Sequence, residues 1–166
     1  MEKYTLSVLV YNQPGALARV ASLFSRRGFN IESLAVGTTN MEGISRMTIR
    51  ILATVQIVEQ MVAQIQKLMS VIVVQVLPQG QEVSRELLLI KVACDQSSRE
   101  AVARIVDIFR ARIIDVSRGS MTIEITGEED KNSAFIEMLQ DYGIIEMART
   151  GMVALERGVA SISNVL

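Results

Sequence analysis

Hydrophobic and polar positions in the first half of the chain alternate between strand-like and helix-like patterns. Four β-rich runs predict strands, over residues 5–10, 31–37, 44–51 and 71–77. Two segments with apolar residues at helical spacing predict helices, over residues 17–24 and 58–68. Pro14 suits a first helical turn, and Gly28 suits a C-terminal helix cap. The first half therefore predicts the element order βαββαβ.

The second half repeats this order of elements without repeating the sequence itself. Strand-like runs cover residues 87–94, 113–116, 121–125 and 144–155. Helical spacing is found over residues 102–109 and 135–142, and Ser97 and Glu100 have capping-box spacing before the first of these helices. The sequence predicts an α+β protein of two ferredoxin-like βαββαβ domains, with residues 1–78 and 84–166 joined by a linker over residues 79–83.

The strand over residues 44–51 shows the clearest alternation. Its apolar side chains share one face, at Met47, Ile49 and Ile51, and its polar side chains share the other, at Arg46, Thr48 and Arg50. This pattern predicts a strand with one face in the core and one in solvent. Four arginines, Arg46, Arg50, Arg118 and Arg149, fit either solvated strand faces or a surface for a partner.

Charge and composition exclude several classes of partner. The 17 basic and 18 acidic residues give a formal net charge of −1, so no strong field attracts nucleic acid or an acidic membrane. No apolar stretch approaches the roughly 18–20 residues of a membrane span, and residues 1–4 lead into a strand rather than a signal peptide. The single cysteine, Cys94, ends an apolar run and is expected to be buried in a protein of the reducing cytoplasm.

The absence of histidine limits the chemistry of the chain. Histidine is the commonest general base near neutral pH and the commonest metal ligand, and the sequence contains none. His-based triads and His-dependent zinc sites are therefore excluded, and no carboxylates are arranged for catalysis. We expect neither catalytic residues nor a metal site in this chain.

The turn at Asn12, Gln13, Pro14 and Gly15 is the main candidate binding site. It lies between a predicted strand and a predicted helix, where free N–H groups and the helix dipole favour an anion such as a carboxylate. The Asn12 side chain can accept from an ammonium group or donate to a carboxylate, which suits a free amino acid. The alternative is a strand-to-helix turn that needs Pro and Gly for geometry alone. Asn30, after the same helix, likewise fits either a turn residue or a ligand-binding side chain.

Several strings of this sequence resemble one known family, the small regulatory subunits of acetolactate synthase, also called acetohydroxyacid synthase. In the first half the resemblance rests on residues 6–10, 12–20, 27–34 and 45–49. In the second half it rests on residues 85–92, 109–116 and 148–151. The match extends over nearly the whole chain.

The resemblance implies a regulatory function without catalysis in this chain. It implies that residues 1–78 form an ACT domain, which dimerises with a second copy and binds valine or a related branched-chain amino acid at the interface. Catalysis belongs in this family to a separate large subunit carrying thiamine diphosphate, magnesium and flavin (FAD). The small subunit raises the activity of the large subunit and confers feedback inhibition.

The same resemblance assigns the effector site residue by residue. Asn12 and Gly15 of one protomer would hold the polar groups of the effector, and Asn30 and Ile31 would come from the neighbouring protomer. The remaining loop and helix residues would enclose the effector, at Gln13, Pro14, Ala16 and Leu17. One departure is Tyr11, because relatives often carry an acidic residue at this place, before the asparagine.

Two other classes of function remain as alternatives. One is a stand-alone amino-acid sensor or transcriptional cofactor, which differs from a regulatory subunit in having no synthase partner. The other is an RNA-binding ferredoxin-like module. Such a module stacks bases on aromatic side chains of its sheet, whereas the four Phe and three Tyr of this chain are not clustered on one strand.

Overall fold

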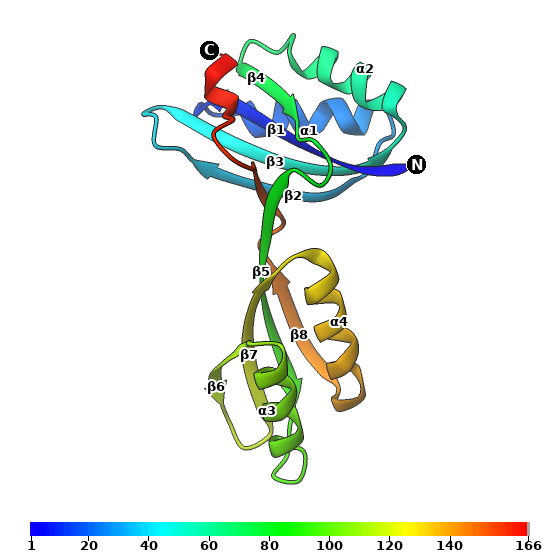
Figure 1. Ribbon diagram of the computed structural model, residues 1–166, viewed down its shortest axis with the longest axis vertical. Helices are drawn as coiled ribbons and strands as arrows, with labels where there is room; N and C mark the ends of the chain where they lie inside the picture. The colour runs from blue at the N-terminus through cyan, green and yellow to red at the C-terminus, as the bar shows by residue number, and fades with distance from the viewer. Residues whose placement is uncertain (166) are drawn as a thin grey trace. The chain divides into compact units, whose positions relative to one another are not determined.

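The chain forms two compact units in the computed structural model, which describes residues 1–165 (Figure 1). The first unit contains Met1–Val83 together with the segment that begins at Met152. The second unit contains Ser84–Gly151. The polypeptide therefore crosses between the units twice.

The first unit is a four-stranded antiparallel sheet with two helices on one face (Figure 1). Its elements are β1 (Glu2–Tyr11), α1 (Ala16–Arg26), β2 (Ile31–Thr38), β3 (Ile44–Ala53), α2 (Val55–Ile65) and β4 (Val71–Val76). The strand order is β2-β3-β1-β4, so β2 and β4 are the edges. The core between sheet and helices includes Leu6, Met47 and Phe24, each no more than 1% exposed. The predicted βαββαβ order is confirmed.

The second unit repeats the arrangement with a separate core. Its elements are β5 (Glu82–Ala93), α3 (Arg99–Ile108), β6 (Arg112–Val116), β7 (Ser120–Gly127), α4 (Glu129–Leu139), a 3₁₀ turn (Gln140–Tyr142) and β8 (Ile144–Arg149). The strand order is β6-β7-β5-β8. Phe135 is fully buried and meets the ring of Phe109 edge-on, with ring centroids 5.2 Å apart. The second βαββαβ prediction is confirmed.

The second compact unit ends at Gly151, earlier than the predicted second domain over residues 84–166. The expected continuous extended segment over residues 144–155 is divided into β8 and β9 (Val153–Glu156). From Met152 the chain belongs to the first unit, and a 3₁₀ turn (Ile162–Val165) follows β9. Ile162 is 4% exposed and packs with Leu9 and Val73. Apolar burial against β1 and β4 thus holds a tail whose composition did not mark it as part of this unit.

The polar face of β3 is covered, although its alternation predicted a solvated face. Thr48 is only 3% exposed, and the Arg46 guanidinium donates a hydrogen bond to the Ala154 carbonyl at 3.0 Å. Burial disfavours the charged guanidinium and lowers the pKa of Arg46. The alternation along β3 is as predicted, but periodicity does not distinguish a solvated face from one covered by a returning segment of the same chain.

Asp95, rather than the predicted capping box of Ser97 and Glu100, binds the backbone N–H groups before helix α3. The N-cap position is Ser98, whose side chain makes no capping hydrogen bond. Asp95 instead accepts hydrogen bonds at one carboxylate oxygen from the N–H groups of Ser97 and Ser98, both at 2.9 Å. The hydroxyls of the same two serines also donate to it. These donors, led by the Ser97 side chain, lower the pKa of Asp95 from 3.8 to about 2.

Asp95 is therefore expected to make stability depend on acid pH. Because its pKa is lower in the folded than in the unfolded chain, its contribution is complete above about pH 4 and is lost as the pH falls towards about 2. We expect Asp95→Asn to lower the thermal midpoint at neutral pH, and the difference from wild type to shrink between about pH 4 and 2. Thermal unfolding of both proteins between about pH 4 and 2 measures this difference in midpoint. A pH-independent difference would contradict the assignment.

Candidate functional site

The loop before α1 is fixed by backbone hydrogen bonds and leaves its side chains in solvent. The Asn12 N–H donates to the Gly43 carbonyl at 2.8 Å, and the Ala16 N–H donates to the Gln13 carbonyl at 3.2 Å. Helix α1 begins at Ala16, so Pro14 lies in the preceding turn rather than in the first helical turn as predicted. Residues 12–15 are all exposed. The loop thus holds a defined shape while its polar groups face outward.

The N-terminus of α1 is suited to an anion. Gly15 occupies the N-cap position with φ 84° and has no side chain that could make a capping hydrogen bond. The first turn of the helix contains no acidic residue. The N–H groups of a first turn lack intrahelical acceptors, and the helix dipole places partial positive charge there. A carboxylate bound at this end would supply the missing acceptor.

Arg19 is a residue of this site that was not selected from the sequence. A Cβ atom placed on Gly15 would lie 3.7 Å from Arg19 Nη2, so the guanidinium lies beside the glycine. A cation near a helix N-terminus is unfavourable unless an anion is close. The available signal was the spacing of four residues from Gly15, because helical side chains point back towards the N-terminus.

Ala16 and Leu17, the first two residues of α1, are both assigned to the effector site but have different environments. Ala16 is 4% exposed and its side chain belongs to the core of the first unit. Leu17 is 43% exposed on the surface of α1. Of these two side chains, only that of Leu17 is available to a ligand or a second protein chain.

Asn30 is positioned by the predicted glycine cap at the other end of α1. Gly28 has φ 69°, its N–H donates to the Ser25 carbonyl, and the Phe29 N–H donates to the Phe24 carbonyl at 3.0 Å. These bonds form a Schellman motif, which ends the helix and turns the chain. Asn30 then stands exposed immediately before β2, which begins at half-buried Ile31.

The structure does not bring the two halves of the predicted site together within one chain. Asn12 and Gly15 precede α1, whereas Asn30 and Ile31 follow it. Helix α1 has 11 residues and is therefore roughly 16 Å long at about 1.5 Å per residue. An amino acid spans less than half that length. Both halves contact one ligand only if they come from different chains.

Other surfaces offer little competing chemistry. One cavity of about 250 Å³ lies on the opposite sheet face of the first unit, between Lys3, Arg50 and Gln79. Another, of about 230 Å³, lies on the sheet of the second unit beside Lys91 and Glu146. Within residues 1–165, no group of three or more Cys, Asp or Glu is arranged to hold a metal ion. No helix in that range is both long and apolar enough to cross a membrane.

Comparison with known proteins gives consistent matches along the chain. Residues 6–73 match a model described as an AHAS small subunit-like ACT domain, and residues 85–158 match one described as the small subunit of acetolactate synthase. The acetolactate synthase small subunit of Mycobacterium bovis is 52% identical over 161 residues, covering 97% of this chain and 96% of that protein. The Aquifex aeolicus small subunit is 47% identical over 158 residues, covering 95% and 82%.

A solved structure extends this similarity to the fold. The crystal structure of the acetolactate synthase small subunit from Thermotoga maritima is 41% identical, with a TM-score of 0.89. The alignment covers 96% of this chain and 100% of that chain. The similarity therefore includes both units.

Proposed function

This chain belongs to the acetolactate synthase small-subunit family, and from that premise we propose that it is a feedback regulator that binds a branched-chain amino acid, with valine the preferred effector. It associates with an acetolactate synthase large subunit and raises its activity. The large subunit carries thiamine diphosphate, magnesium and FAD. The effector site is made by two copies of the first unit.

The observation that carries this proposal is the separation of Asn12 and Gly15 from Asn30 and Ile31 by the length of α1. A site built from all four residues needs two chains. A two-fold symmetric dimer supplies each half twice and so makes two equivalent sites. Dimerisation is then a requirement of binding.

The edge strand β2 provides a way to form this dimer. β2 ends at Thr38, which pairs with Ser45, and Ser45 in turn pairs with Val10 near the end of β1. Asn12 therefore lies at the end of the sheet where β2 finishes, and Ile31 at the opposite end. Antiparallel pairing of β2 with β2 of a second copy reverses the direction of that copy. It brings Ile31 of the second copy to the end that carries Asn12.

The polar groups of the proposed site match the two charges of a free amino acid. The N-terminus of α1 and the Arg19 guanidinium favour the carboxylate. The side-chain oxygens of Asn12 and of Asn30 from the second copy can accept from the ammonium group. Exposed Leu17 and half-buried Ile31 offer apolar surface to a branched side chain.

Isothermal calorimetry of the dimer with valine, leucine and isoleucine tests the site. We expect binding of at least one of them, and a loss of about 10- to 100-fold in affinity for Asn30→Ala, because hydrogen bonds to charged groups contribute about 1.5–3 kcal/mol. Asn40→Ala, in the exposed turn between β2 and β3, is the matched control and should bind as wild type. Undiminished binding by Asn30→Ala would contradict the proposed site.

Activity of a large subunit with and without this chain tests the partner. We expect the chain to raise the synthase rate and valine to lower it again. A chain that binds a branched-chain amino acid but neither associates with nor activates the large subunit would instead be a stand-alone sensor.

A further inference from the structure

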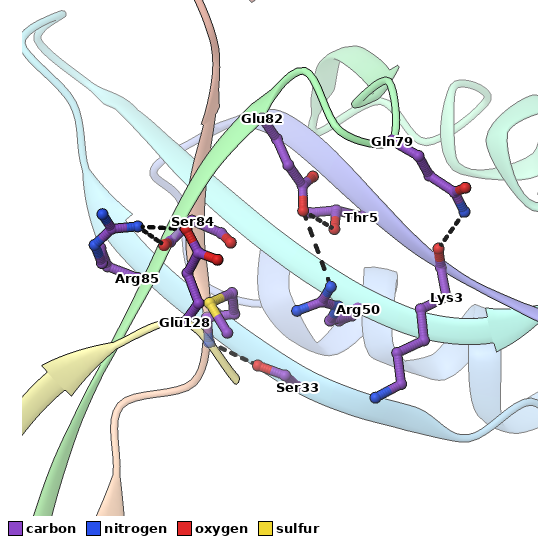
Figure 2. Close-up of polar contacts among 10 residues, drawn as sticks. Lys3, Thr5, Ser33, Arg50, Gln79, Glu82, Ser84, Arg85 and Glu128 are labelled. Atoms are coloured by element: carbon purple, nitrogen blue, oxygen red, sulfur yellow. Dashed lines mark hydrogen bonds and ion pairs between the residues drawn. The ribbon is translucent and has the colours of Figure 1, made fainter. Parts of the chain in front are cut away.

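The sheet face opposite the helices of the first unit holds both connections to the second unit. The chain leaves the first unit at Val83 and re-enters it at Met152. Figure 2 shows side chains from β1, β2 and β3 on this face, among them Thr5, Ser33 and Arg50. These polar contacts fix the ends of the outgoing and returning segments.

The outgoing connection is held through Glu82. Its Oε1 accepts a hydrogen bond from Thr5 Oγ1 at 3.3 Å and lies 3.9 Å from Arg50 Nη2 (Figure 2). Thr5 and Arg50 are direct partners in the β1–β3 register. These contacts come from the central strands of the sheet, and neither strand carries a residue assigned to the effector site.

The returning connection is held by three side chains from three different strands. The Met152 N–H donates to Ser33 Oγ of β2 at 2.7 Å. Arg46 of β3 donates to the Ala154 carbonyl, and Gln75 Nε2 of β4 donates to Glu156 Oε2 at 2.6 Å. The Ser33 bond is made to the first residue of the returning segment.

Ser33 also lies close in sequence to the proposed effector site, across a β-bulge. Ile31 pairs with Ile51, whereas Ser33 pairs with Arg50, so the register shifts between Ile31 and Ser33. Because of this shift, Ile31 packs against the core on the helix side while Ser33 faces the opposite side. The bulge thus connects a predicted effector residue on one face of the sheet to an anchor on the other.

We propose that Ser33 is the positioning residue through which occupancy of the effector site changes the returning connection at Met152. The proposal rests on the proposed function, because it needs an effector at Asn30 and Ile31. A ligand shifts a conformational equilibrium only if it has different affinities for the two states. Movement of the start of β2 changes the position of the Ser33 hydroxyl, and the two states differ in its bond to Met152.

The experiment compares Ser33→Ala, Ser33→Thr and the control Gln75→Ala in the full chain. Gln75→Ala removes another anchor of the same returning segment from β4, which carries no predicted effector residue. Calorimetry measures the effector affinity of the dimer, and activity assays of the reconstituted holoenzyme measure maximal inhibition. Hydrogen exchange of the Met152 amide is measured with and without saturating valine.

We expect Ser33→Ala to bind valine within about threefold of wild type but to show less than about half of the wild-type maximal inhibition, as expected for loss of a coupling of modest size. The effector-dependent change in Met152 exchange should disappear. Ser33→Thr should restore both responses, and Gln75→Ala should retain them.

Three results would overturn the inference. Full inhibition and a wild-type response of the Met152 amide in Ser33→Ala would remove the assigned role of the hydroxyl. Equal losses in Ser33→Ala and Gln75→Ala would indicate general loosening of the segment. Absence of valine binding by the wild-type dimer would overturn both the proposed function and this inference. The first two results, obtained with intact valine binding, would overturn this inference alone.

Discussion

Gly15→Asp is expected to abolish feedback inhibition while leaving activation of the large subunit intact. The new Cβ would lie 3.7 Å from Arg19 Nη2, so the introduced carboxylate reaches the guanidinium and the N-terminus of α1. It then occupies the donors that the effector carboxylate needs and repels that carboxylate. Two like charges about 4 Å apart cost roughly 4 kcal/mol at an effective dielectric constant of about 20.

The measurement is inhibition of the reconstituted holoenzyme over a wide range of valine concentrations. We expect at least a ~100-fold increase in the concentration for half-maximal inhibition, a lower figure than the full charge repulsion gives because the loop is exposed. Gly15→Asn is the matched control, since it adds a side chain of the same size at the same positive φ without the charge. Inhibition of Gly15→Asp at the wild-type valine concentration would refute the carboxylate position.

Mixing Asn12→Ala chains with Asn30→Ala chains is expected to restore the high-affinity binding that each variant loses on its own. In each homodimer, both sites carry the same defect. In a heterodimer, one site combines both substitutions and the other contains neither, because each site takes Asn12 from one chain and Asn30 from the other. Random exchange at equal amounts gives about half heterodimers, so about a quarter of all sites should regain wild-type affinity.

Calorimetry after subunit exchange measures the restored fraction, and native mass spectrometry establishes that heterodimers formed. The control mixes Asn12→Ala with a chain carrying both substitutions, which leaves no intact site in any dimer. If confirmed heterodimers of the two single variants recover no high-affinity binding, the site does not lie between two chains in the proposed way.

Local patterns were sufficient where the structure depends on neighbouring residues. The apolar spacing in α1 predicted a helix that buries Val20 and Phe24, and Gly28 was correctly predicted to cap it. The turn residues after β1 correctly marked the strand-to-helix connection. In each case the determining interactions are between residues close in sequence, so the local sequence is sufficient to predict the local structure.

Local patterns did not predict contacts between segments far apart in the sequence. The sequence did not indicate that Arg46 would bond to Ala154, 108 residues away, or that Ile162 would pack against β1 and β4. The role of Asp95 was likewise not predicted, because its carboxylate, rather than the capping box, binds the backbone N–H groups at the start of α3. Which polar group binds which backbone donor depends on geometry that spacing alone does not fix.

The order of elements, the repeat of the βαββαβ unit and the family of the chain could all be predicted from the amino-acid sequence. These follow from periodicity, turn chemistry and long motif strings, all of which are properties of consecutive residues. The return of the C-terminal segment to the first unit, and the separation of the two halves of the predicted effector site by the length of α1, became visible only in the folded chain. Both depend on distances between residues far apart in the chain, and these are fixed by packing.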